Sequence, residues 1–228
     1  MPRPENQRKQ TDETFVLHSF FRSSTSFRVR AALNLKRLSY RQITHDFRKD
    51  EQRAQGYLAI NPQGLVPTLC VSGEFCLSQS LAIIEWLDEV YPEPSLIPGD
   101  AEGRARVRAL AQIVAMDIHP INNLRVLNAL RERFSANDAA VADWFRHWAE
   151  LGMDAFEEQL TRSTRTGRFC HGNTITLADI CLVSQAVSNR RFGINSETWP
   201  EVNRIAGACL EREEFQAALP DAQPDATK

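Results

Sequence analysis

With 43% hydrophobic and 25% charged residues, this chain of 228 residues has the composition of an ordinary globular protein of one large or two small domains. Its formal net charge of only −2 argues against a nucleic-acid partner and against an anionic membrane surface. No apolar run approaches the ~20 residues that span a bilayer, so no membrane segment is predicted.

The N-terminus and the cysteines bear on the cellular compartment. Residues 1–13 lack the apolar segment of a secretory signal and have nothing to bury, which predicts a disordered leader. The cysteines are odd in number and follow neither a metal-binding nor a Cys-x-x-Cys spacing, so no metal site is predicted. These features predict a cytoplasmic protein without a disulfide, whose free thiols are Cys70, Cys76, Cys170, Cys181 and Cys209.

The N-terminal part of the chain alternates between strand and helix periods. Its predicted elements, in chain order, are a strand at 15–20, a helix at 24–37, a strand at 39–47, a hairpin at 68–71 and 75–77, and a helix at 79–90. A βαβ unit followed by ββα is the pattern of a thioredoxin-like α/β domain with a mixed four-stranded sheet. We assign residues 14–91 to this domain.

A linker and a second, all-α domain follow. Residues 91–100, YPEPSLIPGD, contain three prolines and one glycine, which predicts a linker at 92–101. The rest is predicted to be helical over 102–220, with a tail at 221–228. Apolar residues at helical spacing from Val107 to Ile118 predict one helix, which Pro120 kinks or ends.

A long helix is predicted from Ala139 to about Leu160, with Trp144, Trp148 and Phe156 on its inner side. After it, Thr176 and Asp179 have the spacing of a capping box in which Asp replaces Glu or Gln. The apolar residues that follow predict a buried central helix, so we interpret Asp179 as structural.

Three hydroxyl-bearing residues, Ser23, Ser24 and Thr25, follow the first predicted strand and open the first predicted helix. Such residues commonly cap a helix through their side-chain oxygens. The same position also gathers hydroxyl donors and free backbone N–H groups at the positive end of the helix dipole, where an anion is favoured. Because a free thiol has a pKa of about 8.5, a site of this kind can stabilise a thiolate. These residues alone leave both interpretations open.

Two further pairs of residues allow a structural and a binding interpretation. An X-Pro bond is cis in only about 5–6% of cases in folded proteins, so the sequence by itself favours a trans bond at Val66-Pro67. A cis bond would turn the Val66 backbone outward, where its N–H and C=O could pair with an extended peptide. Gln79 and Ser80 either cap the next helix or bind a carboxylate through Ser80 and the N-terminal amides.

The order and spacing of these segments resemble the zeta class of glutathione transferases, which includes maleylacetoacetate and maleylpyruvate isomerases. The resemblance runs from Phe15 into the C-terminal tail and is carried by RSSTSFRVR, NPQGLVP, QSLAIIEWL, DIHPINNLRVL and TLADICLV. It implies the glutathione transferase fold, glutathione as the cofactor, a homodimer, and a cis bond before Pro67. In this family the first serine of an SSC motif holds the thiolate, which corresponds to Ser23 here. Thr25 replaces the cysteine of that motif, which keeps a donor and loses a thiol.

The resemblance also implies roles for individual residues. It makes Ser23 and Thr25 catalytic. It places glutathione against Ser23, Ser24, Thr25, Gln52, Val66, Pro67, Gln79, Ser80, His119 and Asn123. Taken singly, each of three arginines reads as a surface residue, but all three fall where the family places cations that face the electrophile: Arg22, Arg125 and Arg191. A guanidinium binds both oxygens of a carboxylate, so this set suits a small-molecule substrate with two carboxylates.

The implied activity is glutathione-dependent cis–trans isomerisation of a maleyl keto acid in the breakdown of aromatic compounds. The thiolate adds to the cis double bond, the new single bond rotates, and elimination returns the tripeptide unconsumed. Two alternatives stay open: a transferase that conjugates small electrophiles or acts on α-halo acids, and a glutathione-binding protein without catalytic activity. Consumption of glutathione during turnover distinguishes them.

Overall fold

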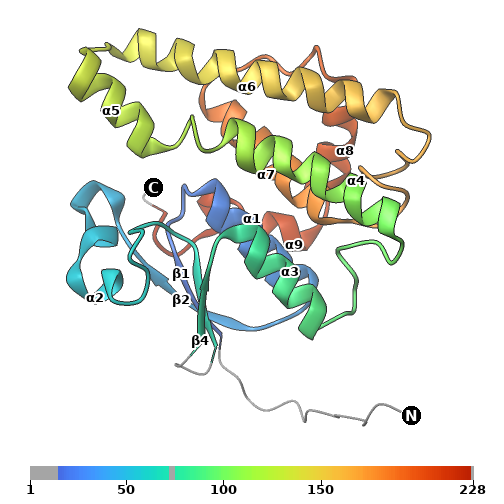
Figure 1. The fold of residues 1–228 in the computed structure, drawn as a ribbon, viewed down its shortest axis with the longest axis horizontal. Coiled ribbons are helices and arrows are strands. Elements are labelled where there is room, and N and C mark those ends of the chain that lie inside the picture. The colour runs from blue at the N-terminus through green and yellow to red at the C-terminus, as the bar shows by residue number, and fades with distance from the viewer. Residues whose placement is uncertain (1–14, 72–74, 227–228) are drawn as a thin grey trace.

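A mixed four-stranded sheet forms the base of the molecule, and the helices are layered above it (Figure 1). The computed structural model describes residues 15–71 and 75–226; the predicted leader at 1–13 and the turn of the predicted hairpin lie outside them. The strands are β1 (Phe15–Ser19), β2 (Tyr40–Thr44), β3 (Thr68–Val71) and β4 (Phe75–Ser78). The helices of this half are α1 (Ser24–Leu35), α2 (Gln55–Leu58) and α3 (Ser80–Val90), with 3₁₀ turns η1 (Phe47–Lys49) and η2 (Glu51–Arg53) before α2.

The strand order is β2-β1-β3-β4, in which β1 runs parallel to β2 and antiparallel to β3. Leu17 lies opposite Gln42 on one side and Leu69 on the other, and both leucines are fully buried. The parallel pair needs a crossover, which α1 supplies, whereas β3 and β4 form a hairpin. The predicted mixed sheet of a thioredoxin-like domain is therefore confirmed.

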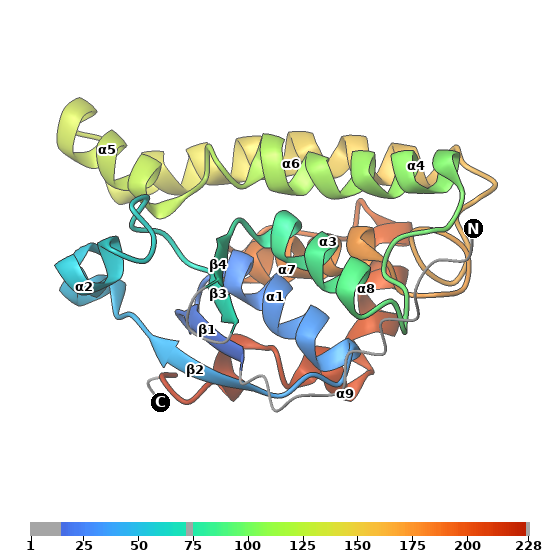
Figure 2. The same ribbon diagram turned by 60° about the horizontal axis from the view of Figure 1, so that its bottom comes forward.

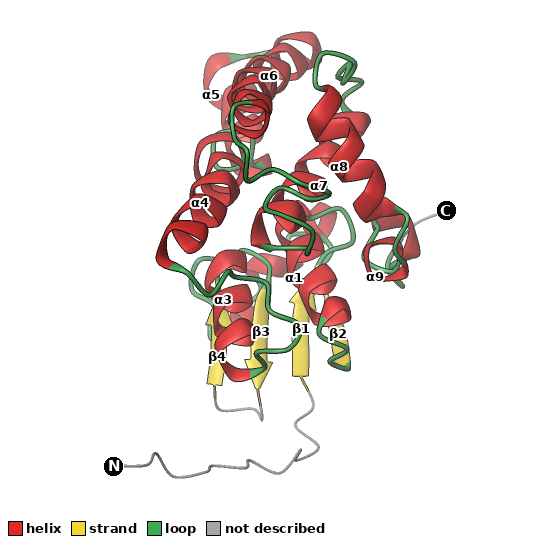
Figure 3. Ribbon diagram, turned by 90° about the vertical axis from the view of Figure 1, so that its right-hand side faces the viewer, coloured by secondary structure: helices red, strands yellow, loops and turns green. Residues whose placement is uncertain are grey.

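Most helices of the second half lie above α1 and α3, whereas α9 lies beside α1. Their bounds are α4 (Ala101–Gln112), η3 (Ile113–Ile118), α5 (Leu124–Phe134), α6 (Asp138–Thr161), α7 (Leu177–Arg191), α8 (Pro200–Leu210), α9 (Glu213–Gln216) and η4 (Pro220–Ala222). In Figure 3, α1 and α3 cover the sheet, α7 lies on α1, and α6 lies farthest from the strands. Figure 2 shows α4, α5 and α6 along the outer side of the molecule. One apolar core continues from the sheet into these helices.

The proline-rich segment between the two halves is fixed by one buried cation. Lys36 at the end of α1 forms an ion pair of 2.8 Å with Asp88 of α3 and donates to the carbonyl oxygens of Tyr91 and Pro94. Asp88 also accepts the backbone N–H of Leu96, which is buried. The linker predicted at 92–101 is thus tied to the sheet half.

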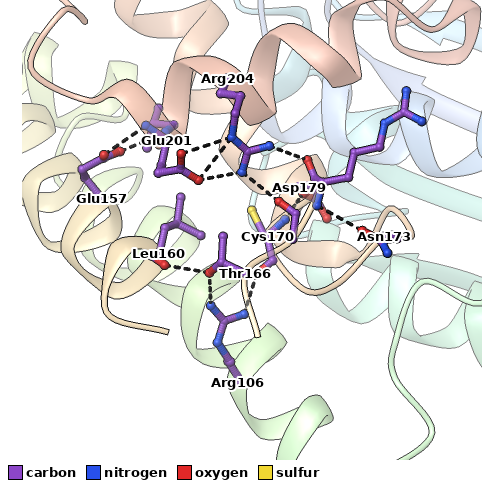
Figure 4. Close-up of polar contacts among 12 residues, drawn as sticks. Arg106, Glu157, Leu160, Thr166, Cys170, Asn173, Asp179, Glu201 and Arg204 are labelled. Atoms are coloured by element: carbon purple, nitrogen blue, oxygen red, sulfur yellow. Dashed lines mark hydrogen bonds and ion pairs between the residues drawn. The ribbon is translucent and has the colours of Figure 1, made fainter. Parts of the chain in front are cut away.

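The capping box predicted at the start of α7 is present (Figure 4). One carboxylate oxygen of Asp179 accepts the backbone N–H of Thr176 and the other accepts that of Cys170, at 2.8 and 2.7 Å. Asp179 is fully buried, and desolvation raises its pKa. Nearby, Arg106 donates to the carbonyl oxygen of Cys170, so these contacts hold the loop before α7 in place. The structural interpretation of Asp179 is confirmed.

The prediction that all the cysteines are free is wrong. Cys70 and Cys76 form a disulfide, because the hairpin places them directly opposite each other on β3 and β4 with Cα atoms 4.0 Å apart. The pairing follows from the hairpin itself, which the sequence pattern had indicated. The free thiols are Cys170, Cys181 and Cys209, all of them buried.

Two helix predictions need correction in detail. The inner line of α6 runs through Phe145, Ala149 and Met153 to Phe156, so Trp148 is only half-buried at the side of the helix. The predicted helix from Val107 to Ile118 ends in the π-helical segment η3. There the backbone N–H of His119 bonds to the carbonyl oxygen of Val114 at 2.9 Å, and the widened turn ends the helix just before Pro120. Of the helices that the structure describes, none has the length and apolarity that crossing a bilayer requires.

Candidate active site

Two adjoining cavities lie where the sheet half meets the helical half. The first, of about 510 Å³, lies between the start of α3, the loop at Pro67 and η3. The second, of about 440 Å³, lies between the loop before α1, the start of α5 and the end of α7. Five residues line both cavities: Thr25, Leu65, Val66, His119 and Asn123. The start of α1, at Thr25, and the loop that contains Val66 and Pro67 (the Val-Pro loop) therefore meet at the boundary between the two cavities.

Ser23 is the N-cap of α1 and also lines the second cavity. Its Oγ accepts the backbone N–H of Ser26 at 3.1 Å and lies 2.8 Å from the hydroxyl of Thr25. The Thr25 hydroxyl in turn donates to the carbonyl oxygen of Val66 at 3.0 Å. Capping and exposure to the cavity thus occur together, so the two sequence interpretations of Ser23 do not exclude each other.

The peptide bond between Val66 and Pro67 is cis. Two hydrogen bonds fix the loop that contains this bond. The hydroxyl of Tyr57 and the amide of Asn61 both donate to the carbonyl oxygen of Leu65, at 2.6 and 2.8 Å. Within residues 15–71 and 75–226, the backbone N–H of Val66 has no hydrogen-bond partner. A backbone donor is therefore available at the wall that both cavities share.

The start of α3 faces the first cavity. Gln79, its N-cap, has a φ of 72° and makes no side-chain cap; its amide donates instead to Gln63 at 3.0 Å. Gln79 thus occupies the N-cap position of α3 without a side-chain capping hydrogen bond. Ser80, Leu81 and Ala82, the first residues of the helix, line the cavity. Its first amides and its positive dipole end are directed at that space.

His119 connects the two cavities through a chain of hydrogen bonds. Asn123 caps α5 by accepting the N–H of Arg125 with its amide oxygen, so its amide nitrogen is the group 3.4 Å from Nε2 of His119. That nitrogen can only donate, which makes Nε2 an acceptor and Nδ1 the protonated atom. Nδ1 then donates to the hydroxyl of Ser24 at 3.2 Å. Desolvation and the charges of Arg28 and Arg125 lower the pKa of His119 to about 3, so the ring is neutral.

The three predicted arginines do not share one cavity. Arg22 and Arg191 line the second cavity, where a guanidinium nitrogen of Arg191 lies 3.4 Å from the carbonyl oxygen of Arg22. Desolvation and the charge of Arg22 lower the pKa of Arg191. Arg125 lines the first cavity instead, since it follows the cap of α5 on the side of η3. Arg48 also lines the second cavity, so three arginines, two of them predicted, face that space.

The second cavity also has an apolar wall. The rings of Phe145 and Phe192 stack at 3.6 Å with an angle of 8° between their planes, and those of Phe20 and Phe47 stack at 4.9 Å. All four rings line the cavity. A cavity with aromatic walls and three guanidinium groups suits a short, unsaturated, anionic molecule.

Comparison with known proteins places these features in a family. The model of the glutathione S-transferase N-terminal domain matches residues 17–95. A maleylpyruvate isomerase of Ralstonia sp. is 48% identical over 209 residues, which cover 92% of this chain and 98% of the relative. The chain belongs to the zeta class of glutathione transferases. The solved holo structure of a maleylpyruvate isomerase of that class superposes with a TM-score of 0.91 at 47% identity, covering 93% of this chain and 100% of the other.

A second solved relative of this zeta-class chain is a maleylacetoacetate isomerase from Methylobacterium extorquens AM1 with bound malonate and glutathione. It is 37% identical, has a TM-score of 0.91, and is matched over 93% of this chain and 100% of its own length. The predicted resemblance and fold are thereby confirmed.

One predicted residue of the zeta-class site lies apart from the others, and several residues that line the cavities were not predicted, among them Gln63 and Arg28 in the first cavity. Gln52 is buried, its amide donates to Asp50 at 3.0 Å, and it lines neither cavity. Gln63 lies within NPQGLVP, two residues before Leu65, so its position next to the Val-Pro loop could have indicated it. Arg28 lies inside α1, and its sequence position carries no such signal.

Proposed function

We propose that this zeta-class chain is a glutathione-dependent cis–trans isomerase that converts maleylacetoacetate or maleylpyruvate into its fumaryl isomer. One observation carries the proposal: a hydroxyl cluster at the start of α1 adjoins the cis-proline loop, in a cavity that Arg22 and Arg191 face. The relatives named for this activity, and the one that holds both glutathione and a dicarboxylate, support it.

The residues present fit glutathione. The N–H of Val66, which has no partner in the part of the chain that the structure describes, and the start of α3, which has no side-chain cap there, offer donors to a peptide and to a carboxylate. Ser80 would hold the γ-glutamyl end in the first cavity, and the Val66 backbone would pair with the cysteinyl residue. Among the described residues, no three His, Cys, Asp or Glu side chains are grouped as metal ligands would be.

The residues of the chain would then stabilise the charge of the thiolate and fix the position of the substrate. Bound glutathione would supply the thiolate that adds reversibly to the double bond and permits rotation. Ser23 would donate its hydroxyl hydrogen to the sulfur, and the N-terminus of α1 would add positive potential. Arg22 and Arg191 would hold the substrate carboxylates, and the stacked phenylalanines would keep water from the double bond.

The experiment follows both glutathione and product. Purified protein is incubated with maleylpyruvate and, separately, with maleylacetoacetate, using glutathione at a small fraction of the substrate concentration. We expect complete conversion to the fumaryl isomer while the glutathione thiol concentration stays constant. Loss of one thiol for each substrate molecule would instead identify a conjugating transferase. Tripeptide binding without turnover of either substrate or of an α-halo acid would identify a binding protein.

We further propose a homodimer in the cytoplasm. Apolar side chains such as Met116 and Phe134 are exposed on the single chain, which supports association with a second copy. The cytoplasm is proposed because the mechanism needs glutathione as a free thiol, which reducing compartments maintain. Light scattering coupled to size-exclusion chromatography tests the dimer, and fractionation of the source cells tests the location.

A further inference from the structure

The C-terminal segment, residues 220–226, packs against the loop that precedes α1. Its Gln223 is buried and donates to the carbonyl oxygens of Ala217 and Leu219, at 2.9 and 2.8 Å. The backbone N–H of Ala226 donates to the carbonyl oxygen of Gln223 at 3.0 Å. Ala226 then contacts an apolar cluster formed by Phe20, Phe21, Tyr57 and Val66. This part of the chain is therefore folded onto the wall of the candidate site.

The loop between β1 and α1, residues 20–22, is bound through its middle residue, Phe21. The backbone N–H of Phe21 donates to Oδ2 of Asp225 in the C-terminal segment at 3.0 Å. Its carbonyl oxygen accepts Nη2 of Arg30 at 3.2 Å. The ring of Phe21 is buried in the apolar cluster. Both polar backbone groups of Phe21 are thus bound by charged side chains.

Arg30 joins the same loop to the C-terminal end of the chain. Its Nη1 donates to Oγ of Ser19 at 2.9 Å, and its Nε and Nη2 donate to the carbonyl oxygen of Ala218, at 3.1 and 3.0 Å. Burial lowers the pKa of Arg30 to about 10, which leaves it a cation at neutral pH, and the charge of Asp225 acts on it. The position of Phe21 therefore depends on one anion and one cation that the C-terminal end of the chain brings together.

Phe21 in turn supports Arg22. The guanidinium of Arg22 lies over the ring of Phe21, 5.0 Å from its centroid, and Arg22 lines the second cavity. Ser23 has contacts of its own, because its N–H donates to the carbonyl oxygen of Phe20 at 3.0 Å and its Oγ accepts the N–H of Ser26. A displacement of Phe21 should therefore move Arg22 more than Ser23.

We propose that Asp225 is a positioning residue for Arg22: by accepting the N–H of Phe21, it fixes the place from which Arg22 binds a carboxylate of the substrate. The inference rests on the proposed function, in which Arg22 holds that carboxylate. Asp225 lines neither cavity, so it acts through the loop. Its charge alone would repel a dianionic substrate, whereas its hydrogen bond favours binding. Loss of the charge and loss of the hydrogen bond therefore have opposite expected effects.

Steady-state kinetics with the keto acid that the unaltered protein isomerises separates these effects. Asp225→Ala removes both the acceptor and the charge, whereas Asp225→Asn keeps an amide oxygen that can accept the N–H of Phe21. We expect Asp225→Ala to raise the Michaelis constant for the keto acid about three- to tenfold, as for one lost hydrogen bond to a charged group. Turnover and the Michaelis constants for glutathione and for a neutral aryl halide should change less than about twofold. In Asp225→Asn the Michaelis constant for the keto acid should be no higher than in the unaltered protein.

Two comparisons distinguish positioning from a general loss of structure. In a protein that already contains Arg22→Met, adding Asp225→Ala should change the Michaelis constant for the keto acid less than about twofold, because the residue through which Asp225 acts is gone. Asp100→Ala is the matched control. Asp100 also accepts a backbone N–H, that of Gly103 at 2.7 Å, and lines neither cavity. Its loss should leave the Michaelis constants unchanged, whatever it does to the unfolding temperature.

Hydrogen exchange measures the proposed hydrogen bond without any assay of activity. The backbone amide of Phe21 should exchange slowly in the unaltered protein and in Asp225→Asn, and faster in Asp225→Ala. If the amide of Phe21 exchanged in the unaltered protein as fast as in an unfolded peptide, the inference would be overturned. This measurement needs no variant, so the inference stays testable even if Asp225→Ala does not fold.

The kinetic outcomes separate this inference from the proposed function. If the unaltered protein isomerises neither keto acid, the proposed function fails and this inference with it. If it isomerises one of them and Asp225→Ala leaves the Michaelis constant unchanged, only the inference fails. A lower Michaelis constant in both Asp225 variants would show that Asp225 acts by its charge. An equal rise with and without Arg22→Met would show that it does not act through Arg22, and either result would overturn the inference.

Discussion

The hydroxyl of Thr25 donates to the carbonyl oxygen of Val66 at 3.0 Å and so joins the start of α1 to the cis-proline loop. A threonine hydroxyl has one hydrogen, which this bond uses. The 2.8 Å contact between Ser23 and Thr25 must therefore be donated by Ser23. The Ser23 hydroxyl is thus oriented by Thr25 and has to turn from it to reach a thiolate.

Replacing Thr25 by valine keeps the shape of the side chain and removes both hydrogen bonds. We expect the Michaelis constant for glutathione to rise about fivefold, the equivalent of one ordinary hydrogen bond of about 1 kcal/mol. Thr25→Ser keeps the hydroxyl and should remain close to the unaltered protein. Steady-state kinetics at varied glutathione measures this, and equal values for the valine and serine variants would contradict it.

Ser23→Ala should lower turnover about 10- to 100-fold, because a charge-assisted hydrogen bond contributes about 1.5–3 kcal/mol. Glutathione affinity should change little, since the other contacts remain. The absorbance of the bound thiolate, followed against pH, should show a higher thiol pKa in the variant.

Ser23 is also the N-cap of α1, so its loss should cost about 1 kcal/mol of stability. The N-cap of α6 is Asn137, whose side-chain oxygen accepts the N–H of Ala140 at 2.9 Å. The substitution Asn137→Ala removes this cap and serves as the control. It should reproduce the loss of stability and leave turnover intact. A turnover defect of the same size in both variants would remove Ser23 from the chemistry.

Arg191→Met should raise the Michaelis constant for a dianionic substrate about tenfold or more, and should barely change that for a neutral aryl halide. The guanidinium of Arg191 binds a carboxylate of the dianionic substrate, whereas a neutral electrophile has no carboxylate for it to bind. Arg190→Met is the matched control, because this exposed neighbour lines neither cavity. Equal changes for the two substrates would exclude Arg191 from carboxylate binding.

Two histidines should make the protein less stable in mild acid. Burial and the neighbouring charges of His45 and Arg41 lower the pKa of His18 to about 4, and that of His119 is lowered to about 3. Below about pH 6.5 the unfolded chain binds protons that the folded chain does not. The free energy of unfolding should therefore fall as the pH is lowered from about 6.5 toward 4 and 3, by at most about 1.4 kcal/mol per pH unit for each histidine.

Denaturant titrations of the unaltered protein, His119→Asn and the control His147→Asn at several pH values would measure this dependence. His119→Asn should have a shallower slope, whereas the control at an exposed position should keep the slope of the unaltered protein. If the free energy of unfolding of His119→Asn depended on pH as steeply as that of the unaltered protein, the pKa of His119 would not be lowered in the folded protein.

The disulfide predicts a thiol count. Denatured under non-reducing conditions, the protein should expose three titratable thiols, those of Cys170, Cys181 and Cys209. After reduction the count should rise by the two from Cys70 and Cys76. Mass spectrometry of alkylated peptides assigns them, and alkylation of Cys70 or Cys76 before reduction would contradict the pairing.

Local signals explain which features could be predicted from the sequence. The change between strand and helix periods of the apolar residues predicted the sheet and α1. The spacing of Thr176 and Asp179 predicted the capping box of α7. Both signals are local, because propensity and capping act over a few residues. The pairing of Cys70 with Cys76 needed the register of the hairpin, and the separation of Arg125 from the other two arginines needed the path of the chain after η3. The path of the chain after η3 is not encoded within a short window.

The sequence by itself determined the order of elements, the family, and the residue types that thiolate and carboxylate chemistry need. Only the tertiary structure decided that Thr25 orients Ser23 against Val66, that His119 is neutral between two cavities, and that Asp225 binds the backbone of Phe21. The physical reason is that desolvation and hydrogen-bond direction depend on what lies around a group in space. Those neighbours come from helices and loops far apart in the chain.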